Sequence, residues 1–327
     1  MQDPIFPCPK GLSNLLKPIA TKFSLPTFPI HAHEIVIAFV VYHLILTRLS
    51  PWASARLFPK TYPHLSTKTK LNWDVHVVSL IQALFISTFA LWVMFFDDER
   101  ADMHHVFGYT GSHGALQGFA AGYFVWDLFL SFLHYDIFGP GFAAHAVCAL
   151  TVFMLGFRPF VNYYAPVFLL FELSNPFLNF HWFFDKLKMT GGRAQLVNGL
   201  LLITMFFSCR VVWGTINTFR VFGDVWEAYN NIPEEFAVQG QSVPIWLAAT
   251  YLGSNSILNF LNYYWFTRMI QTLRSRFDKP SKKVDTVVVE GTEVDMTETA
   301  KELKELEKEM LEVVDGLVDG KVKSKDE

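Results

Sequence analysis

Long apolar stretches constrain this sequence more than any other feature. A transmembrane helix needs about 20 mainly apolar residues, and seven stretches approach that length. They cover residues 30–49, 75–96, 115–133, 142–157, 160–184, 194–213 and 243–266. Only Arg158 and Pro159 separate the fourth stretch from the fifth, so a re-entrant fourth segment with six spans is the alternative. The pattern predicts an all-α fold, a polytopic membrane helical bundle with about seven transmembrane helices.

The composition agrees with a membrane protein. Hydrophobic residues make up 51% of the chain and charged residues 17%, whereas soluble proteins carry about 25% charged residues. Much of the charge lies in residues 279–327, which hold nine Lys and fourteen Asp or Glu. The apolar body has no basic cluster of the kind that binds nucleic acid. The three cysteines show neither zinc-binding nor disulfide spacing, so we expect no nucleic-acid partner, metal or cofactor.

Charged loops indicate the orientation, because Lys and Arg concentrate in cytoplasmic loops. The loops after the first, fifth and seventh stretches are basic, and those after the second and sixth are acidic. The basic residues include Arg56, Lys60, Lys68, Lys70, Lys186, Lys188, Arg193, Arg268, Arg274 and Arg276, and the acidic ones include Asp97, Asp98, Glu99, Asp102, Asp224, Glu227, Glu234 and Glu235. This alternation predicts seven crossings, a luminal N-terminus and a cytosolic C-terminus.

Apolar residues in the C-terminal tail form a short seam. Leu303, Leu306, Met310, Val313 and Leu317 recur at steps of three and four, the spacing of a coiled coil. Such a seam would allow two copies of the chain to associate through their tails. The alternative is a solvated tail with transient helix.

Polar residues recur inside the spans at helical spacing, which places them on one face of each helix. The stripes are Asn72, His76, Ser79 and Gln82; Tyr123, Asp127, Ser131 and His134; Glu172, Asn175 and Asn179; Arg210, Trp213 and Asn217; and Tyr251, Asn255, Asn259 and Asn262. Ionisable groups in membrane helices nearly always face the bundle interior or a wet cavity. The stripes therefore predict an inward polar cavity. Interhelical packing by the asparagines and a buried structural pair among Asp127, His145 and Glu172 are the alternatives.

Three of these polar residues are candidates for catalysis. His134 and His145 would serve as general bases, because histidine titrates near neutral pH. Asp127 would orient one of them or act as an acid, a role also open to Glu172. The adjacent His104 and His105 lie in an acidic loop and are expected to be solvated.

Four motifs resemble those of the TLC (TRAM, Lag1 and CLN8) domain family. Residues 72–83 are similar to the family's opening motif, and Gly122-Tyr-Phe-Val-Trp-Asp127-Leu is similar to its "GYF..DL" helix. His145 lies where the family usually carries two adjacent histidines, and residues 171–182 are similar to "ELSTPFxNxRW". The resemblance covers about residues 66–275 and is strongest to the TMEM56-like (TLCD4-like) branch.

The resemblance implies a six-helix barrel around a lipid-accessible cavity, with one helix before it, in the endoplasmic reticulum. The chain then divides into an N-terminal segment with the first transmembrane helix (1–65), a TLC-like transmembrane domain (66–275) and a charged, partly disordered cytosolic tail (276–327). The expected lining of the lipid cavity is His76, Gln82, Tyr123, Asp127, Glu172, Asn175, Asn179, Arg210, Asn255 and Asn259.

The resemblance leaves three functions open. The family includes ceramide synthases, which transfer a fatty acyl group from acyl-CoA to a sphingoid amine, and proteins without established catalysis that affect membrane lipids. Here the second histidine of the catalytic pair is Ala146, and His181 replaces the arginine of the last motif. We therefore expect a protein that binds membrane lipid and contributes to lipid and sphingolipid homeostasis. The alternatives are a ceramide-synthase-like N-acyltransferase, binding acyl-CoA and a sphingoid base with His145 as its base, and a transporter or channel.

Overall fold

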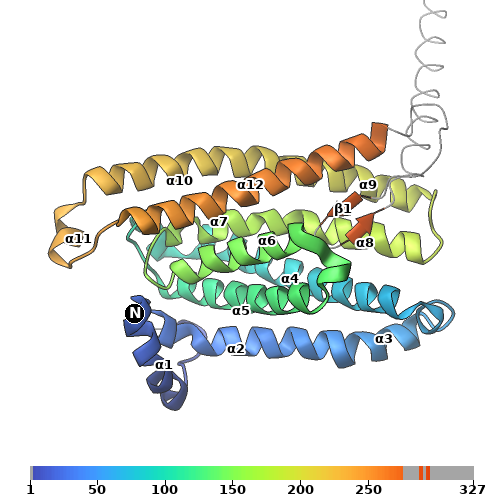
Figure 1. The fold of residues 1–327 in the computed structure, drawn as a ribbon, viewed down its shortest axis with the longest axis horizontal. Coiled ribbons are helices and arrows are strands. Elements are labelled where there is room, and N and C mark those ends of the chain that lie inside the picture. The colour runs from blue at the N-terminus through green and yellow to red at the C-terminus, as the bar shows by residue number, and fades with distance from the viewer. Residues whose placement is uncertain (1–2, 275–286, 290–291, 295–327) are drawn as a thin grey trace, which may run out of the picture.

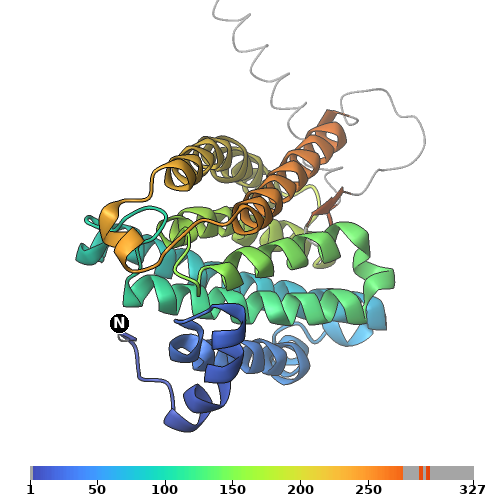
Figure 2. The same ribbon diagram turned by 60° about the vertical axis from the view of Figure 1, so that its left-hand side comes forward.

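The structure is a computed structural model that describes residues 3–274, 287–289 and 292–294 of the 327-residue chain. Its long helices run side by side along one axis (Figures 1 and 2). The α-helices are α1 (Lys10–Phe23), α2 (Phe28–Leu44), α3 (Ser50–Leu57), α4 (Thr67–Phe96), α5 (Gly111–Leu133), α6 (Tyr135–Leu155), α7 (Ala165–Leu169), α8 (Asn175–Lys186), α9 (Arg193–Phe206), α10 (Trp213–Asn230), α11 (Glu234–Val238) and α12 (Ile245–Arg274). This architecture confirms the predicted all-α membrane bundle.

Shorter helical turns connect or interrupt these helices. Two are π-helical, η1 (Ile45–Leu49) and η6 (Phe207–Val212). Four are 3₁₀ turns: η2 (Tyr62–His64), η3 (Asp98–Arg100), η4 (Asn162–Tyr164) and η5 (Leu170–Ser174). Two short strands, β1 (Val287–Val289) and β2 (Thr292–Val294), pair antiparallel. The predicted coiled-coil seam lies outside the described residues.

Five helical stretches in the described part of the chain are long and apolar enough to cross a membrane. They are Phe28–Leu57, Thr67–Phe96, Gly111–Leu133, Tyr135–Leu155 and Arg193–Asn230. They include the predicted fourth span, whose helix is interrupted at Gly139 with a φ of 77°, and its crossing stays a prediction. Their surfaces expose large apolar side chains such as Phe95, 72% exposed, and Phe219, 75% exposed. Exposed apolar surface of this kind fits contact with lipid.

The predicted fifth span, 160–184, is not one continuous helix. It consists of η4, α7, η5 and α8, so a 3₁₀ segment separates two short α-helices. Pro166 and Pro176 lie in the first turns of α7 and α8, where the missing N–H of proline removes no helical hydrogen bond. Irregular backbone at membrane depth is tolerated where the protein satisfies its polar groups. The break therefore requires partners from neighbouring helices.

The last two predicted spans also differ from the observed helices. The sixth, 194–213, extends to Asn230, because α9, η6 and α10 form one stretch of 38 residues. The seventh, 243–266, corresponds to α12, which contacts α6 and α10. Its asparagine stripe makes α12 more polar than the five apolar stretches. The count of seven crossings stays a prediction.

Charged loops lie at opposite ends of the bundle. The basic connections between α3 and α4 and between α8 and α9 lie at the right-hand end in Figure 1. At the left-hand end lie α11, with Glu234 and Glu235 in its first turn, and the start of the chain. The folded chain thus separates the basic loops from this acidic one, as the alternation of charge predicted.

Gly122 lets α2 and α5 pack closely. A Cβ atom at this position would lie 2.5 Å from the carbonyl oxygen of Ile35 and 2.7 Å from the Cβ of Ala38. Backbone atoms cannot move aside as a flexible side chain can, so a larger residue would force the helices apart. This close approach gives a physical reason for glycine at the start of the motif 122–128.

Candidate functional site

A buried arginine organises the polar interior. Arg210 lies on the π turn η6 and is 1% exposed. Its guanidinium donates to the side-chain oxygens of Asn175 at 2.7 Å and Asn262 at 3.2 Å. Its Nε also donates to the hydroxyl of Ser174 at 2.9 Å. A π turn interrupts the regular helix and occurs frequently at functional sites. Among the arginines of α9, η6 and α10, Arg210 on this turn is the buried one.

The broken helix between α7 and α8 supplies the partners of Arg210. In η5, the carbonyl oxygen of Phe171 accepts a hydrogen bond from Nε of Arg210 at 3.1 Å. Glu172 Oε1 lies 3.9 Å from Nη2 of Arg210. The other oxygen of Glu172 accepts from the amide of Asn175 at 2.7 Å. The arginine thus satisfies irregular backbone and offsets the charge of a buried carboxylate at the same place.

A small cavity adjoins this network. Its volume is about 40 Å³, above the roughly 10–15 Å³ that a buried water molecule needs. The polar part of its lining is His145, Glu172, Arg210, Asn255 and Asn262, and the apolar part is Phe124, Ala149, Val152, Phe153, Phe168, Leu169, Phe171 and Leu258. Four predicted site residues, His145, Glu172, Arg210 and Asn255, therefore lie around one cavity.

His145 reaches this cavity from α6 and is half-buried. Its ring lies near two aromatic rings, with centroids 6.2 Å from Phe124 and 5.6 Å from Trp265. The next residue, Ala146, is fully buried. An imidazole at that position would need space that the packed helices occupy.

The other two candidates for catalysis are not among the residues that line this cavity. His134 caps the C-terminal end of α5, with its ring against Phe138. Eleven residues separate it from His145, roughly 16 Å along an α-helix, and Gly139, with a φ of 77°, breaks the helical geometry between them. Asp127 is half-buried on α5 and is not among the residues that line the cavity. His134 therefore lies apart from the cavity that His145 lines.

A second polar group links α4 to α8. Nδ1 of His76 and the amide oxygen of Asn179 are 2.6 Å apart, and the amide nitrogen of Asn179 donates to Ser79 at 3.1 Å. The ring of Trp182 stacks on His76 with centroids 4.2 Å apart. His76 and Asn179 therefore share a buried contact, separate from the lining of the 40 Å³ cavity.

Gln82 and Tyr123 connect three helices. The amide oxygen of Gln82 on α4 accepts a hydrogen bond from the hydroxyl of Tyr42 on α2. The ring of Tyr123 on α5 meets the Tyr42 ring edge-on, with centroids 5.5 Å apart. Both residues thus contact α2 through Tyr42, and neither is among the residues that line the cavity beside Arg210.

The asparagine stripe of α12 joins this helix to α10. Asn255 Oδ1 accepts from the Thr218 hydroxyl at 2.9 Å, and Asn259 Nδ2 donates to the same hydroxyl oxygen at 2.6 Å. Such interhelical bonds are common in membrane proteins. For Asn259 the geometry favours the packing alternative, whereas Asn255 packs and also lines the cavity.

Sequence reasoning missed part of this site. Ser174, beside Asn175, contacts Arg210 but was not among the predicted lining residues. Asn262 belonged to the predicted stripe on the last helix. Its position two turns from Asn255 was the signal that would have placed it among the predicted lining residues. A further buried group, formed by Asp3, His33 and Glu34, had no counterpart in the predicted site.

His104 is less solvated than its acidic loop suggested. It is half-buried, and its Nδ1 accepts the backbone N–H groups of Val106 at 3.1 Å and Phe107 at 3.2 Å. Burial and the neighbouring His105 lower the pKa of His104 below 6.5. His105 is 49% exposed and lies 2.8 Å from Asp224. These residues line a surface groove of about 330 Å³ at the acidic end of the bundle.

The long apolar helices, the interrupted span and the buried arginine–carboxylate pair together define a polytopic α-helical membrane protein with a polar core. The family model described as "TLC domain" matches residues 72–271, and the chain belongs to the TLC domain family.

Relatives extend the similarity beyond that domain. An uncharacterized TLC domain-containing protein of Schizosaccharomyces pombe is 38% identical over 82% of this chain and 87% of its own length. Topoisomerase I damage affected protein 4 of Saccharomyces cerevisiae is 32% identical over 77% of this chain and 87% of its length. Human TLC domain-containing protein 4 is 32% identical over 54% of this chain and 67% of its length.

Proposed function

We propose that this chain binds a membrane lipid through the polar core around Arg210 and thereby contributes to membrane lipid and sphingolipid homeostasis. The observation that carries the proposal is the cavity that Arg210 shares with Glu172 and His145. Charged residues at membrane depth are costly and mark functional sites by default. A guanidinium beside a carboxylate offers both a donor and an acceptor to the polar end of a lipid.

Lipid entry requires the cavity to open. Its volume of about 40 Å³ is far below the roughly 300–1,000 Å³ of ligand pockets, so only a small polar group fits the present arrangement. The apolar side includes Phe124, Phe153 and Phe168, all buried. We infer that these rings turn aside to admit an acyl chain while the polar end of the lipid stays near Arg210.

Lipid retention tests this proposal. The wild-type chain, purified in detergent and examined by native mass spectrometry, is expected to carry a lipid. His145→Ala and Glu172→Gln change the cavity lining without removing Arg210 and should reduce the retained fraction. His134→Ala is the matched control, because His134 lies outside the cavity. Equal retention in wild type, His145→Ala and Glu172→Gln would contradict the proposal.

The role in homeostasis needs a cellular measurement. Cells that lack the protein should differ from complemented cells in untargeted lipidomics, and complementation by Glu172→Gln should restore the profile less fully than the wild type. An unchanged lipid profile in the absence of the protein would remove this part of the proposal.

An N-acyltransferase is the second candidate, favoured by the position of His145 in the same cavity as Glu172. A histidine base and a carboxylate in one cavity meet a minimum requirement for proton transfer to and from an attacking amine. Purified protein with acyl-CoA and a long-chain amine would then form an amide, and His145→Ala would abolish it. Absence of product from the wild type with any acyl-CoA would leave the lipid-binding function alone.

We also propose the endoplasmic reticulum membrane as the location, with a luminal N-terminus and a cytosolic C-terminus. The basic loops at one end of the bundle support this orientation, because such loops face the cytosol. In the same scheme, residues 1–65 precede the TLC-like domain of residues 66–275, and residues 276–327 form the cytosolic tail. Protease protection of tags placed at the two termini in microsomes would test the orientation.

A further inference from the structure

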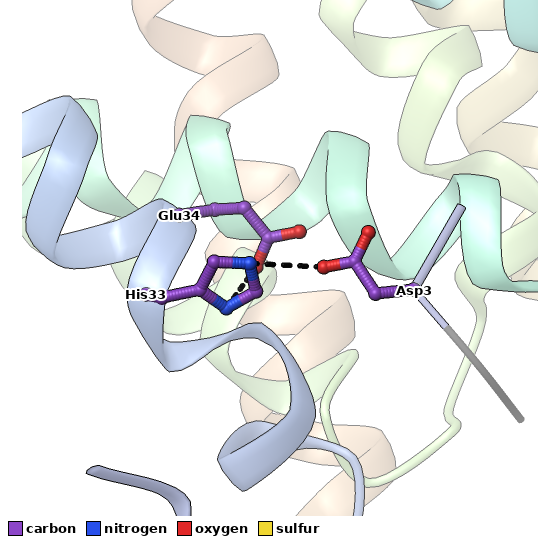
Figure 3. Close-up of side chains that lie close together, drawn as sticks. All are labelled: Asp3, His33 and Glu34. Carbon is purple, nitrogen blue, oxygen red and sulfur yellow. Dashed lines mark ion pairs between the residues drawn. The ribbon is translucent and has the colours of Figure 1, made fainter. Parts of the chain in front are cut away.

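Three buried side chains with metal-binding atoms meet where the start of the chain lies against α2. Asp3 approaches His33 and Glu34, which are neighbours on α2 (Figure 3). Their side chains are 1%, 3% and 0% exposed. One ligand atom from each lies within 4.8 Å of the others. The three residues thus bring two carboxylates and an imidazole together away from water.

Each carboxylate has one fixed oxygen and one oxygen without a hydrogen bond. Oδ1 of Asp3 accepts the backbone N–H of Ile5 at 2.8 Å, while Oδ2 makes no hydrogen bond. Oε1 of Glu34 lies 3.1 Å from Nδ1 of His31, while Oε2 makes no hydrogen bond. Buried polar atoms are normally satisfied, and an exception requires an explanation such as an ion.

His33 faces both carboxylates without a hydrogen bond to either. Its Nε2 is 3.0 Å from Oδ2 of Asp3, and its Nδ1 is 3.4 Å from Oε2 of Glu34. Neither ring nitrogen has hydrogen-bond geometry with a partner. Lone pairs from the three side chains therefore gather in one small volume, as the ligands of a metal ion do.

A neighbouring relay holds Glu34 in place. When Nδ1–H of His31 donates a hydrogen bond to Oε1 of Glu34, Nε2 of His31 accepts one from the hydroxyl of Tyr109 at 2.5 Å. A Cβ atom on Gly114 would lie 2.2 Å from that Nε2, so the small residue leaves the space that the ring needs. Hydrogen-bonded groups behind the ligands orient them in metal sites.

Charge also favours a cation here. In residues 3–274, the ion-pair partners of Asp3 and Glu34 are histidines, with no lysine or arginine. Two buried carboxyl groups without a positive partner are costly to ionise. A divalent cation would stabilise the ionised form of both.

We propose that Asp3, His33 and Glu34 bind a divalent transition-metal ion of the Zn²⁺ class. Imidazole and carboxylate together suit Zn²⁺, and a fourth position would take water or an exogenous ligand. Tetrahedral ligands stand about 3.4 Å apart at Zn–N and Zn–O bond lengths of about 2.1 Å. The observed separations of up to 4.8 Å need small side-chain rotations to reach this geometry. Binding would tie residue 3 to α2.

Metal content tests the proposal directly. The full chain, treated with EDTA, reconstituted with Zn²⁺ and desalted, should retain a single zinc per chain by elemental mass spectrometry. Glu34→Gln, which preserves the shape of the side chain, should retain at most about one tenth of the wild-type zinc, and so should His33→Ala. Tyr109→Phe should weaken zinc affinity by about tenfold. His43→Ala is the matched control on the same helix, since the His43 ring packs against Phe39 and Phe129, and it should retain zinc like the wild type.

Co²⁺ substitution provides a measurement that needs no variant. The wild type reconstituted with Co²⁺ should show the visible absorption bands of a bound ion. Added Zn²⁺ should displace the Co²⁺ and abolish these bands. A wild type that retains neither metal above the buffer background would overturn the proposal and leave an imidazole that shares protons with two carboxylates. Full zinc retention by folded His33→Ala or Glu34→Gln would also overturn it, because the metal would then lie elsewhere.

Discussion

Replacement of Arg210 by methionine should destabilise the bundle strongly. The change removes the donor for four oxygens, those of Phe171, Ser174, Asn175 and Asn262. At about 0.6 kcal/mol for an average hydrogen bond in a membrane protein, these account for about 2–3 kcal/mol. Glu172 would also remain buried without its partner at 3.9 Å. Loss of one member of a buried ion pair costs about 3–5 kcal/mol, so the two contributions sum to about 5–8 kcal/mol.

Removal of the second charge should recover part of this loss. In Arg210→Met/Glu172→Gln no charge is left unpaired, so the double variant should be more stable than Arg210→Met alone, by about 1–3 kcal/mol of coupling. Equilibrium unfolding in mixed detergent, followed by circular dichroism, measures the three variants. Arg220→Met, an exposed site on α10, controls for loss of an arginine. Additivity of the two single changes within about 0.5 kcal/mol would refute the pairing.

Three further predictions concern packing and pH. Gly122→Ala should lower stability by about 1–3 kcal/mol, because its Cβ would meet the backbone of α2; a neutral result in the same unfolding assay would contradict the close approach. Gly253→Ala on α12, where a Cβ meets nothing within 4 Å, should instead stabilise by about 0.4–1 kcal/mol, and destabilisation would argue against the exposed position. Because the pKa of His104 is lowered in the folded chain, the contribution of this residue to stability is complete above pH 6.5 and is lost as the pH falls toward the lowered pKa. The melting temperature of the wild type should therefore fall more across this pH window than that of His104→Ala. Identical pH profiles would exclude a role for the hydrogen bonds that His104 accepts from the backbone.

Hydropathy predicted the membrane bundle because long apolar runs have few other uses in a folded chain. It did not predict where the fifth span breaks. Pro166 and Pro176 do not by themselves specify the 3₁₀ segment between them, because this segment depends on a partner that Arg210 supplies from another helix. Such a break is decided by tertiary contacts, which a window along one segment does not contain.

The candidate site was predictable where its residues repeat at helical spacing. Glu172 and Arg210 stood out as charges at membrane depth, and the structure brings them together. The group around His33 left no such signal. His31 and His33 are two residues apart and do not share a helix face, and Asp3 comes from a proline-rich segment thirty residues earlier. Only the folding of that segment onto α2 unites them.

The π turn at Phe207–Val212 has a consequence for comparing relatives of this chain. One residue more or less in a helix rotates everything beyond it by about 100° and shifts it by about 1.5 Å. A relative without the turn would need a single-residue gap there to keep Trp213 and Asn217 in register with their counterparts. Ungapped alignments across this point would pair lipid-facing positions with interior ones. The rotation of α10 about its axis relative to α9 therefore depends on this π turn.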